Sequence, residues 1–229
     1  ELMGELIDPS ESAIIKKSWL RLWPAKKELP PFSLIVLSLD TAFTEATRDK
    51  KSGNPDPTAC VVLGVFQHEK KNNIMVLDAW DELLGFPDLI KRVRSEMQNR
   101  YGDDGDTAMI KPMYGASKPQ FSGRCPDILL IESKGSGISL QQMLASEGIF
   151  AHEYNPGRAD KLTRLHIVSP VFQKKRVWLP ESDKNAGEPK TWLNNMLDQL
   201  YSYSGPGTTR HDDYIDVLSQ GIRLLMDKR

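Results

Sequence analysis

The chain has 229 residues, of which 39% are hydrophobic and 27% charged, and its formal net charge is −1. This composition supports one globular domain of moderate size and excludes a chain that is disordered throughout. Because the net charge is close to zero, contact with nucleic acid would need a local basic patch. No apolar run is long enough to cross a membrane. The two cysteines, Cys60 and Cys125, lack metal-type spacing, which favours a reducing compartment.

The first part of the chain predicts an arm followed by three strands. Residues 1–31, which contain prolines at positions 24, 30 and 31, are expected to form the arm, with a short strand at 18–23. Apolar runs rich in β-branched residues then predict strands over residues 33–40, 58–67 and 73–82. The polar segment 69–72 predicts a hairpin turn between the last two strands.

The remainder of the chain alternates between helical and strand patterns. Helices are predicted over residues 86–101, 139–147, 161–172 and 192–203, and strands over 128–132, 149–154 and, as a strand or hairpin arm, 174–180. The first three strands can form an antiparallel meander, whereas the later strands need helical crossovers and therefore pair in parallel. We expect an α/β fold with a mixed five-stranded sheet flanked by helices on both faces.

The most informative stretch begins at His211 and opens a final apolar, helix-like run. It contains Asp212, Asp213 and Asp216, which are three or four residues apart and therefore share helix faces. Attraction to the start of the helix accounts for one or two of these acids, but not for three that precede an apolar face. A divalent cation accounts for them, because magnesium and manganese prefer oxygen ligands.

Two more acids, Asp40 and Glu132, stand at the ends of predicted strands. Sites in open α/β sheets gather beyond the carboxyl ends of strands, so both acids are candidate ligands. If they meet Asp213, they can hold two divalent ions for phosphodiester cleavage, one that activates water and one that stabilises the leaving oxygen. Asp40 is expected to bridge the ions and Glu132 and Asp213 to complete one shell each. Asp212 is the alternative ligand.

Other roles remain open for several of these residues. Asp40 is also a suitable turn or cap residue, and the helical acids are also suitable N-terminal caps. Asp216 is either a further ligand or a structural partner of Arg223 or of the backbone. His211 is either a solvated residue before the helix or a manganese or phosphate contact.

The order and spacing of these motifs resemble the ribonuclease-H-like superfamily, and within it the nuclease domain of the large terminase subunit of tailed bacteriophages. The matching pieces are Leu39-Asp40-Thr41-Ala42, Thr58 to Val65, Ile131-Glu132-Ser133, Asp160-Lys161-Leu162-Thr163-Arg164 and His211 to Asp216. The resemblance implies an endonuclease dependent on Mg²⁺ or Mn²⁺, with two ions, that cuts double-stranded viral DNA with low sequence specificity during genome packaging.

The resemblance also implies partners. Large terminases carry an ATPase motor, but this sequence has no Gly-x-x-x-x-Gly-Lys-Ser/Thr loop. We therefore expect residues 1–31 to be the connection to an ATPase domain of the full-length protein, and residues 32–229 to be the nuclease domain. The portal and the small terminase subunit are further expected partners. The expected location is the host cytoplasm, outside the mature virion and without membrane contact.

A basic segment, residues 157–176, is the candidate for contact with DNA phosphates. Its cations are Arg158, Lys161, Arg164, Lys174, Lys175 and Arg176, against the single acid Asp160. Lys161 and Arg164 are the first candidates, because they share a helix face and match the Asp-Lys-x-x-Arg pattern of the family. An ordinary solvated helix face is the alternative.

Two rival functions remain. A junction resolvase or a transposase-type nuclease would have the same fold. A non-catalytic module that docks onto the portal or another packaging subunit would use the acids only as helix caps.

Overall fold

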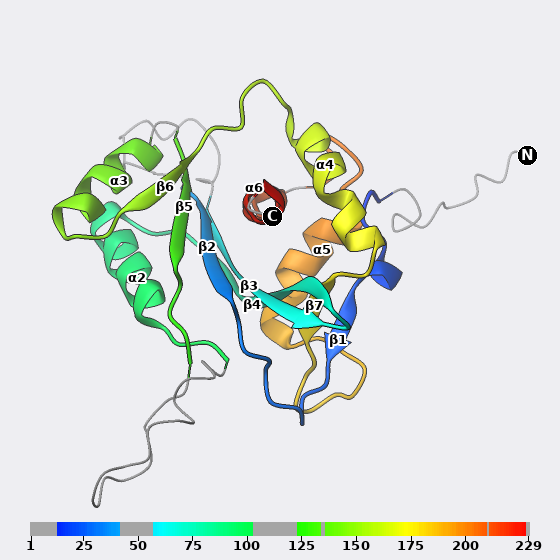
Figure 1. The fold of residues 1–229 in the computed structure, drawn as a ribbon. Helices are drawn as coiled ribbons and strands as arrows, with labels where there is room; N and C mark the ends of the chain where they lie inside the picture. Colours follow the sequence, from blue (N-terminus) through cyan, green and yellow to red (C-terminus); the bar gives the residue numbers. More distant parts are fainter. Residues whose placement is uncertain (1–12, 42–56, 103–122, 134–135, 210, 228–229) are drawn as a thin grey trace, which may run out of the picture.

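The computed structural model describes residues 13–41, 57–102, 123–133, 136–209 and 211–227. In this part of the chain the strands form one mixed sheet with the order β1-β7-β4-β3-β2-β5-β6. Figure 1 shows helices α2 and α3 on one face of the sheet and α4, α5 and α6 on the other. The predicted α/β class, with helices on both faces, is confirmed. The sheet has seven strands where the sequence predicts five.

The antiparallel part of the sheet is the predicted meander. It consists of β2 (Leu34–Asp40), β3 (Thr58–His68) and β4 (Lys71–Glu82), with β3 paired to both neighbours. The β3–β4 turn holds Glu69 and Lys70, whose φ angles are +52° and +60°. Two successive positive φ angles suit the right-handed twist of a two-residue hairpin. The predicted hairpin turn is therefore confirmed.

The parallel strands lie on both sides of this meander. On one side β5 (Ile128–Glu132) pairs with β2, and β6 (Ala151–Tyr154) pairs with β5. Helix α3 (Ser136–Ser146) makes the crossover between β5 and β6. The two added strands are on the other side, where β7 (Val177–Pro180) pairs with β4 and β1 (Arg21–Trp23) pairs with β7.

Tertiary packing decides the placement of β1 and β7. They have three and four residues, too few for an alternating pattern to fix a partner. The rings of Trp23 on β1 and Trp178 on β7 are both buried and meet edge to face, with centroids 5.6 Å apart. The sheet edge is therefore held by an aromatic contact between residues far apart in the sequence.

The described part of the predicted arm packs against the domain. Ala13 and Ile15 are buried, and the Ile14 amide donates to the Tyr203 carbonyl oxygen at 3.3 Å. The single-turn helix η1 (Lys17–Trp19) leads into β1. The proposed link to an ATPase domain stays a prediction, and residues 1–12 lie outside the described residues.

The two faces of β2 belong to two separate cores. Ile35, Leu37 and Leu39 pack toward α2 (Phe86–Gln98) and α3. Val36 packs on the other face, which is covered by α4 (Lys161–Gln173), η3 (Thr191–Leu193), α5 (Asn194–Ser202) and α6 (Asp213–Asp227). Because side chains alternate along a strand, Ser38 and Asp40 lie on the same face as Val36.

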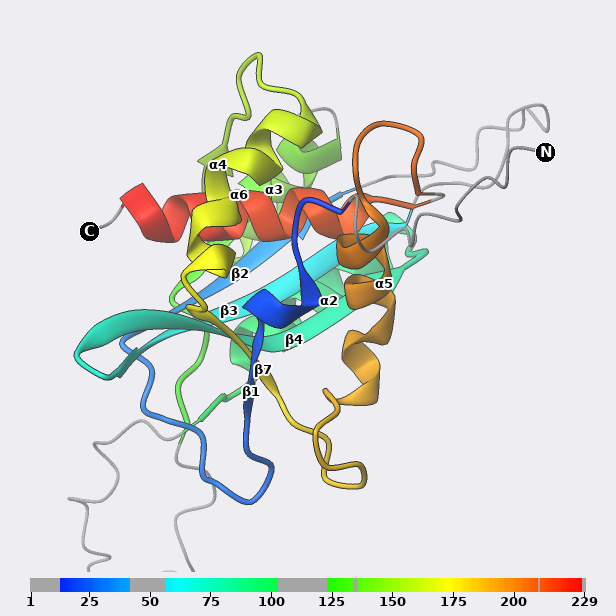
Figure 2. The same cartoon turned by 90° about the vertical axis from the view of Figure 1, so that its right-hand side faces the viewer.

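Helix α6 lies directly against the central strands, and Figure 2 shows it running across the sheet. The Gln220 side-chain amide donates to the Leu39 carbonyl oxygen at 3.0 Å. At Gly221 an added Cβ would lie 2.8 Å from Leu63 Cδ1 and 3.2 Å from Ser38 Cβ. Glycine therefore permits this close approach, which holds α6 against β2. None of the described helices combines the length and apolarity that crossing a bilayer would require.

Candidate metal centre

Asp40 and Glu132 end neighbouring parallel strands. Leu39 pairs with Ile131 in the β2–β5 register, so the next position on each strand holds an acid. Adjacent strands are about 4.8 Å apart. Leu39 and Ile131 pack toward α2 and α3, so the two acids lie on the opposite face, beneath α6. The structure thus places these two predicted ligands beside each other at the carboxyl end of the sheet.

The first turn of α6 brings further carboxylates to this edge. It contains Asp213 and Asp216. The pKa of Asp40 is raised to about 7, first by burial and then by the negative charges of Asp216, Glu132 and Asp213, against the opposing effect of Lys161. Acids from β2, β5 and α6 therefore share one electrostatic neighbourhood, although they are far apart in the sequence.

Two cations of α4 reach into this neighbourhood. The Lys161 Nζ lies 2.5 Å from Asp212 Oδ1 and 2.8 Å from Asp216 Oδ2. The Arg164 guanidinium forms an ion pair with Asp216 and lies 3.9 Å from Glu132 Oε2. Burial alone would lower the pKa of Lys161, but the charge of Asp216 and the hydrogen bond to Asp212 raise it above its ordinary value. Both cations therefore neutralise the carboxylates around Asp40.

The start of α4 aims these two cations. The Asp160 side chain accepts a hydrogen bond of 2.7 Å from the Thr163 amide and so caps the helix. Lys161 and Arg164 lie three residues apart and therefore project from one face, toward α6. The sequence predicts that these two side chains share a face, but it does not predict that this face points toward the carboxylates of α6.

The carboxylate oxygens suit a divalent cation, but these side chains are not close enough together to coordinate one. In the part of the chain that the structure describes, no three acidic, histidine or cysteine side chains are close enough together to hold a metal ion. Charges act over several ångströms, whereas coordination needs oxygens at about 2.0–2.6 Å. The acids offer only oxygen ligands, as magnesium and manganese require. Metal binding would therefore need Asp213, Glu132 and Asp40 to turn toward a common point, with Lys161 and Arg164 yielding.

Asp216 is more central to this arrangement than the sequence predicts. Its carboxylate is 10% exposed and pairs with Lys161 and Arg164, whereas the sequence suggests Arg223 or the backbone. Burial raises the pKa of Asp216, and the two cations lower it. The sequence signal for this role is the position of Asp216 three residues after Asp213, on the same helix face. His211 is exposed, next to Asp212, before the helix begins.

The six predicted DNA-binding cations lie at or near the two ends of α4. Arg158 is exposed in the loop before α4, close in the chain to Lys161 and Arg164. The other three, Lys174, Lys175 and Arg176, follow the far end of α4. A helix rises about 1.5 Å per residue, so its two ends are separated by about 20 Å. Contact of all six with DNA stays a prediction, and one duplex lying along α4 could reach both ends.

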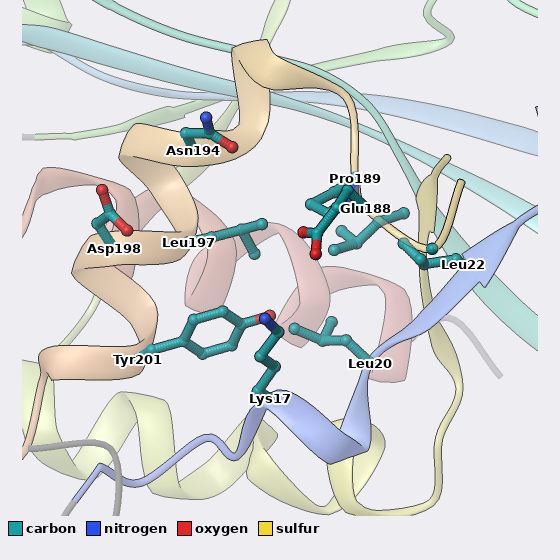
Figure 3. A pocket seen from close by; sticks show the side chains of 11 residues that line it. Lys17, Leu20, Leu22, Glu188, Pro189, Asn194, Leu197, Asp198 and Tyr201 are labelled. Carbon is teal, nitrogen blue, oxygen red and sulfur yellow. The ribbon is translucent and has the colours of Figure 1, made fainter. Parts of the chain in front are cut away.

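Several pockets lie on this face of the sheet, and two of them exceed about 300 Å³. One, of about 310 Å³, opens between the arm and α5; Figure 3 shows Leu20 and Leu22 opposite Leu197 and Tyr201. It contains none of the predicted site residues. The other, of about 400 Å³, is lined by Arg164 and by Tyr154 at the end of β6. Tyr154 pairs with Glu132 in the β5–β6 register, and no signal in the sequence identifies it as a site residue.

Three of the solved structures that are similar to this chain are large terminase nucleases. The large terminase nuclease of the thermophilic phage G20c with bound magnesium matches with a TM-score of 0.52 and 13% identity, over 97% of this chain and 98% of that one. A second structure of the G20c nuclease matches with a TM-score of 0.49 and 12% identity, over 93% and 97% of the two chains. The nuclease domain of the phage SPP1 large terminase with bound manganese gives 0.41 and 12%, over 82% and 97%.

A sequence search of curated proteins finds no significant match. The family model described as the terminase RNaseH-like domain matches residues 107–224, slightly more than half of the chain. This match covers β5, β6 and α6 as far as Leu224, and hence Glu132, Asp213 and Asp216. The chain therefore belongs to the terminase RNase-H-like domain family.

Proposed function

We propose that this domain is a metal-dependent endonuclease that cuts double-stranded DNA with low sequence specificity, at the beginning and end of viral genome packaging in the host cytoplasm. The observation that carries the proposal is the placement of Asp40 beside Glu132, within the electrostatic reach of Asp213 and Asp216. Family membership supports it, as does the shared fold with a terminase nuclease whose structure contains magnesium.

The chain's own carboxylates would hold the metal. Asp40 would be the central ligand because a central strand fixes it, Glu132 and Asp213 would be its partners, and Asp212 or Asp216 would be further ligands. When bound, Mg²⁺ or Mn²⁺ ions, two in this proposal, activate water and stabilise the leaving 3′ oxygen. Asp40, whose pKa is about 7, must lose its proton before it can bind a cation.

Lys161 and Arg164 would have two roles. Without a metal they neutralise the acids of α6. Once a cation takes over that role, they are available for DNA phosphates, together with Arg158. Contacts to phosphates carry no sequence information, which accounts for low specificity. Lys174, Lys175 and Arg176 would contact the backbone elsewhere or face another packaging component, such as the portal, the small terminase subunit or the ATPase domain.

Metal-dependent cleavage tests the proposal. The domain should cut linear duplex DNA with manganese or magnesium, and a chelator should stop cutting. Calorimetry should detect heat on manganese titration, accompanied by a rise in the melting temperature. Neither heat nor a melting shift would favour the docking module, and cutting restricted to branched DNA would favour the resolvase.

A further inference from the structure

The pocket lined by Tyr154 lies one strand beyond the carboxylates. Leu39, Ile131 and Glu153 are in register across β2, β5 and β6, and Glu132 pairs with Tyr154 one residue later. The ends of these three strands thus form a row from Asp40 through Glu132 to Tyr154. With strands about 4.8 Å apart, the pocket begins about one strand spacing from Glu132.

Two arginines from different helices line this pocket. Arg164 comes from α4 and Arg223 from α6. One part of the Arg164 guanidinium contacts Asp216, but its buried Nε has no hydrogen-bond partner among the described residues. A buried N–H without an acceptor is costly, and the positive charge of Arg164, which lines the pocket, favours an anionic oxygen there. Arg223 is exposed and lies two helical turns beyond Asp216 on α6.

The remaining wall is partly apolar. Ile167, which is 37% exposed, lines the pocket together with Tyr154, Asn155 and Ser219. A volume of about 400 Å³ lies within the range of small-molecule sites, which is about 300–1,000 Å³. Two guanidinium groups beside an apolar wall suit a phosphate joined to a sugar and a base better than a bare anion.

We propose that this pocket binds one nucleotide of the DNA strand, next to the phosphate that is cut. Its phosphate contacts Arg164 and Arg223, and its sugar and base lie on Ile167 and Tyr154. Arg164 joins the pocket to the metal centre, because the same guanidinium pairs with Asp216 and lies 3.9 Å from Glu132. The inference rests on the proposed function, because it places the pocket along the path of the substrate.

A substitution of Arg223 tests the pocket without touching the predicted ligands. In an Asp40→Asn background, which cannot cut, affinity for duplex DNA is measured by anisotropy over a range of salt concentrations. Arg223→Ala should lower affinity by about tenfold and the salt slope by about one. Arg223→Lys should restore the slope. The control is Arg94→Ala, since Arg94 is also partly exposed and pairs with Glu147 on the other side of the sheet; it should change neither quantity.

A nucleotide probe distinguishes a nucleotide from a free phosphate. Thymidine 5′-monophosphate should shift the amide resonances of Tyr154 and Ser219 in the unsubstituted domain, and Arg223→Ala should remove these shifts. Equal shifts with inorganic phosphate at the same concentration would overturn the nucleotide assignment.

The same measurements can contradict the pocket proposal and the endonuclease proposal separately. If the unsubstituted domain cuts DNA but Arg223→Ala binds like Arg94→Ala, the pocket proposal is wrong and the endonuclease stands. If no cutting occurs but Arg223→Ala lowers the salt slope, the pocket stands and the endonuclease proposal fails.

Discussion

The Ser38 hydroxyl on β2 donates a hydrogen bond of 2.7 Å to the Val217 carbonyl oxygen on α6. Both residues are buried, and they join the strand that ends in Asp40 to the helix that begins with Asp213. Since Asp40 is two residues from Ser38 and Asp216 is next to Val217, this bond fixes the separation of the two acidic groups.

Removal of that bond should loosen the metal centre. Ser38→Ala leaves the Val217 carbonyl oxygen without this donor and should lower the free energy of unfolding by about 1–2 kcal/mol. Manganese affinity should fall as well, because the acids are held less firmly. Denaturant unfolding and calorimetry measure the two effects. Ser33→Ala is the matched control: its exposed hydroxyl also donates to a backbone oxygen, that of Val65. Equal effects from both substitutions would contradict this role.

Asp40→Ala should separate DNA binding from DNA cutting. Loss of the central ligand should reduce cleavage by more than about 100-fold, beyond the effect expected of an outer-shell partner. Affinity for DNA should stay the same or rise, because a negative charge near the phosphates is removed. Gel assays of cleavage and anisotropy of binding measure this. Asp88→Ala, an exposed acid on α2, is the control. Cleavage at the unsubstituted rate would show that the assigned roles are wrong.

Without metal, the stability of the domain should fall as pH rises. The pKa of Asp40 is raised from 3.8 to about 7, so the folded state holds a proton that the unfolded chain releases near its ordinary pKa. The stability from this group is complete below about pH 4 and declines until about pH 7. Between about pH 5 and pH 8 the expected loss is about 2–3 kcal/mol.

The free energy of unfolding is measured by denaturant unfolding, with chelator present, at pH values between about 5 and 8. Asp216 acts in the same direction, since its pKa is also raised. The lowered pKa values of Asp160 and Glu181 act only at lower pH. Asp40→Asn should therefore flatten most of the slope, and an unchanged slope would locate the buried proton elsewhere.

Lys161→Ala should make the domain more dependent on a divalent cation. Without Lys161, Asp212 and Asp216 lose a common partner. The chelated protein should melt at a lower temperature, because breaking a partly buried ion pair leaves an uncompensated charge. Manganese should restore more stability to this variant than to the unsubstituted domain. Lys190→Ala, which breaks a more exposed pair with Asp183, is the control and should show neither effect. Equal manganese shifts would contradict competition between Lys161 and the metal.

Strand ends were the most predictable part of the site. Asp40 and Glu132 each follow a buried apolar run, so the sequence alone places them at one edge of the sheet. The partners of a side chain were harder to predict. The three-residue spacing of Lys161 and Arg164 places them on one helix face. Only the packing of α4 against α6 brings this face to the carboxylates.

Contacts across the sheet edge were also beyond the sequence. Tyr154 becomes a neighbour of Glu132 through the β5–β6 register, which depends on how the α3 crossover closes. Likewise, β1 joins β7 through buried tryptophans that lie more than a hundred residues apart. Local sequence periodicity does not predict such pairings, because they depend on how distant elements pack together in the folded domain.

The position of α6 also bears on when the site can form during synthesis. Among the described elements α6 is translated last, yet it supplies Asp213 and Asp216 and rests on β2 through Gly221. A nascent chain that still lacks this helix would carry Asp40 and Glu132 without their counterparts. The acidic centre can therefore be completed only after the rest of the described domain has left the ribosome.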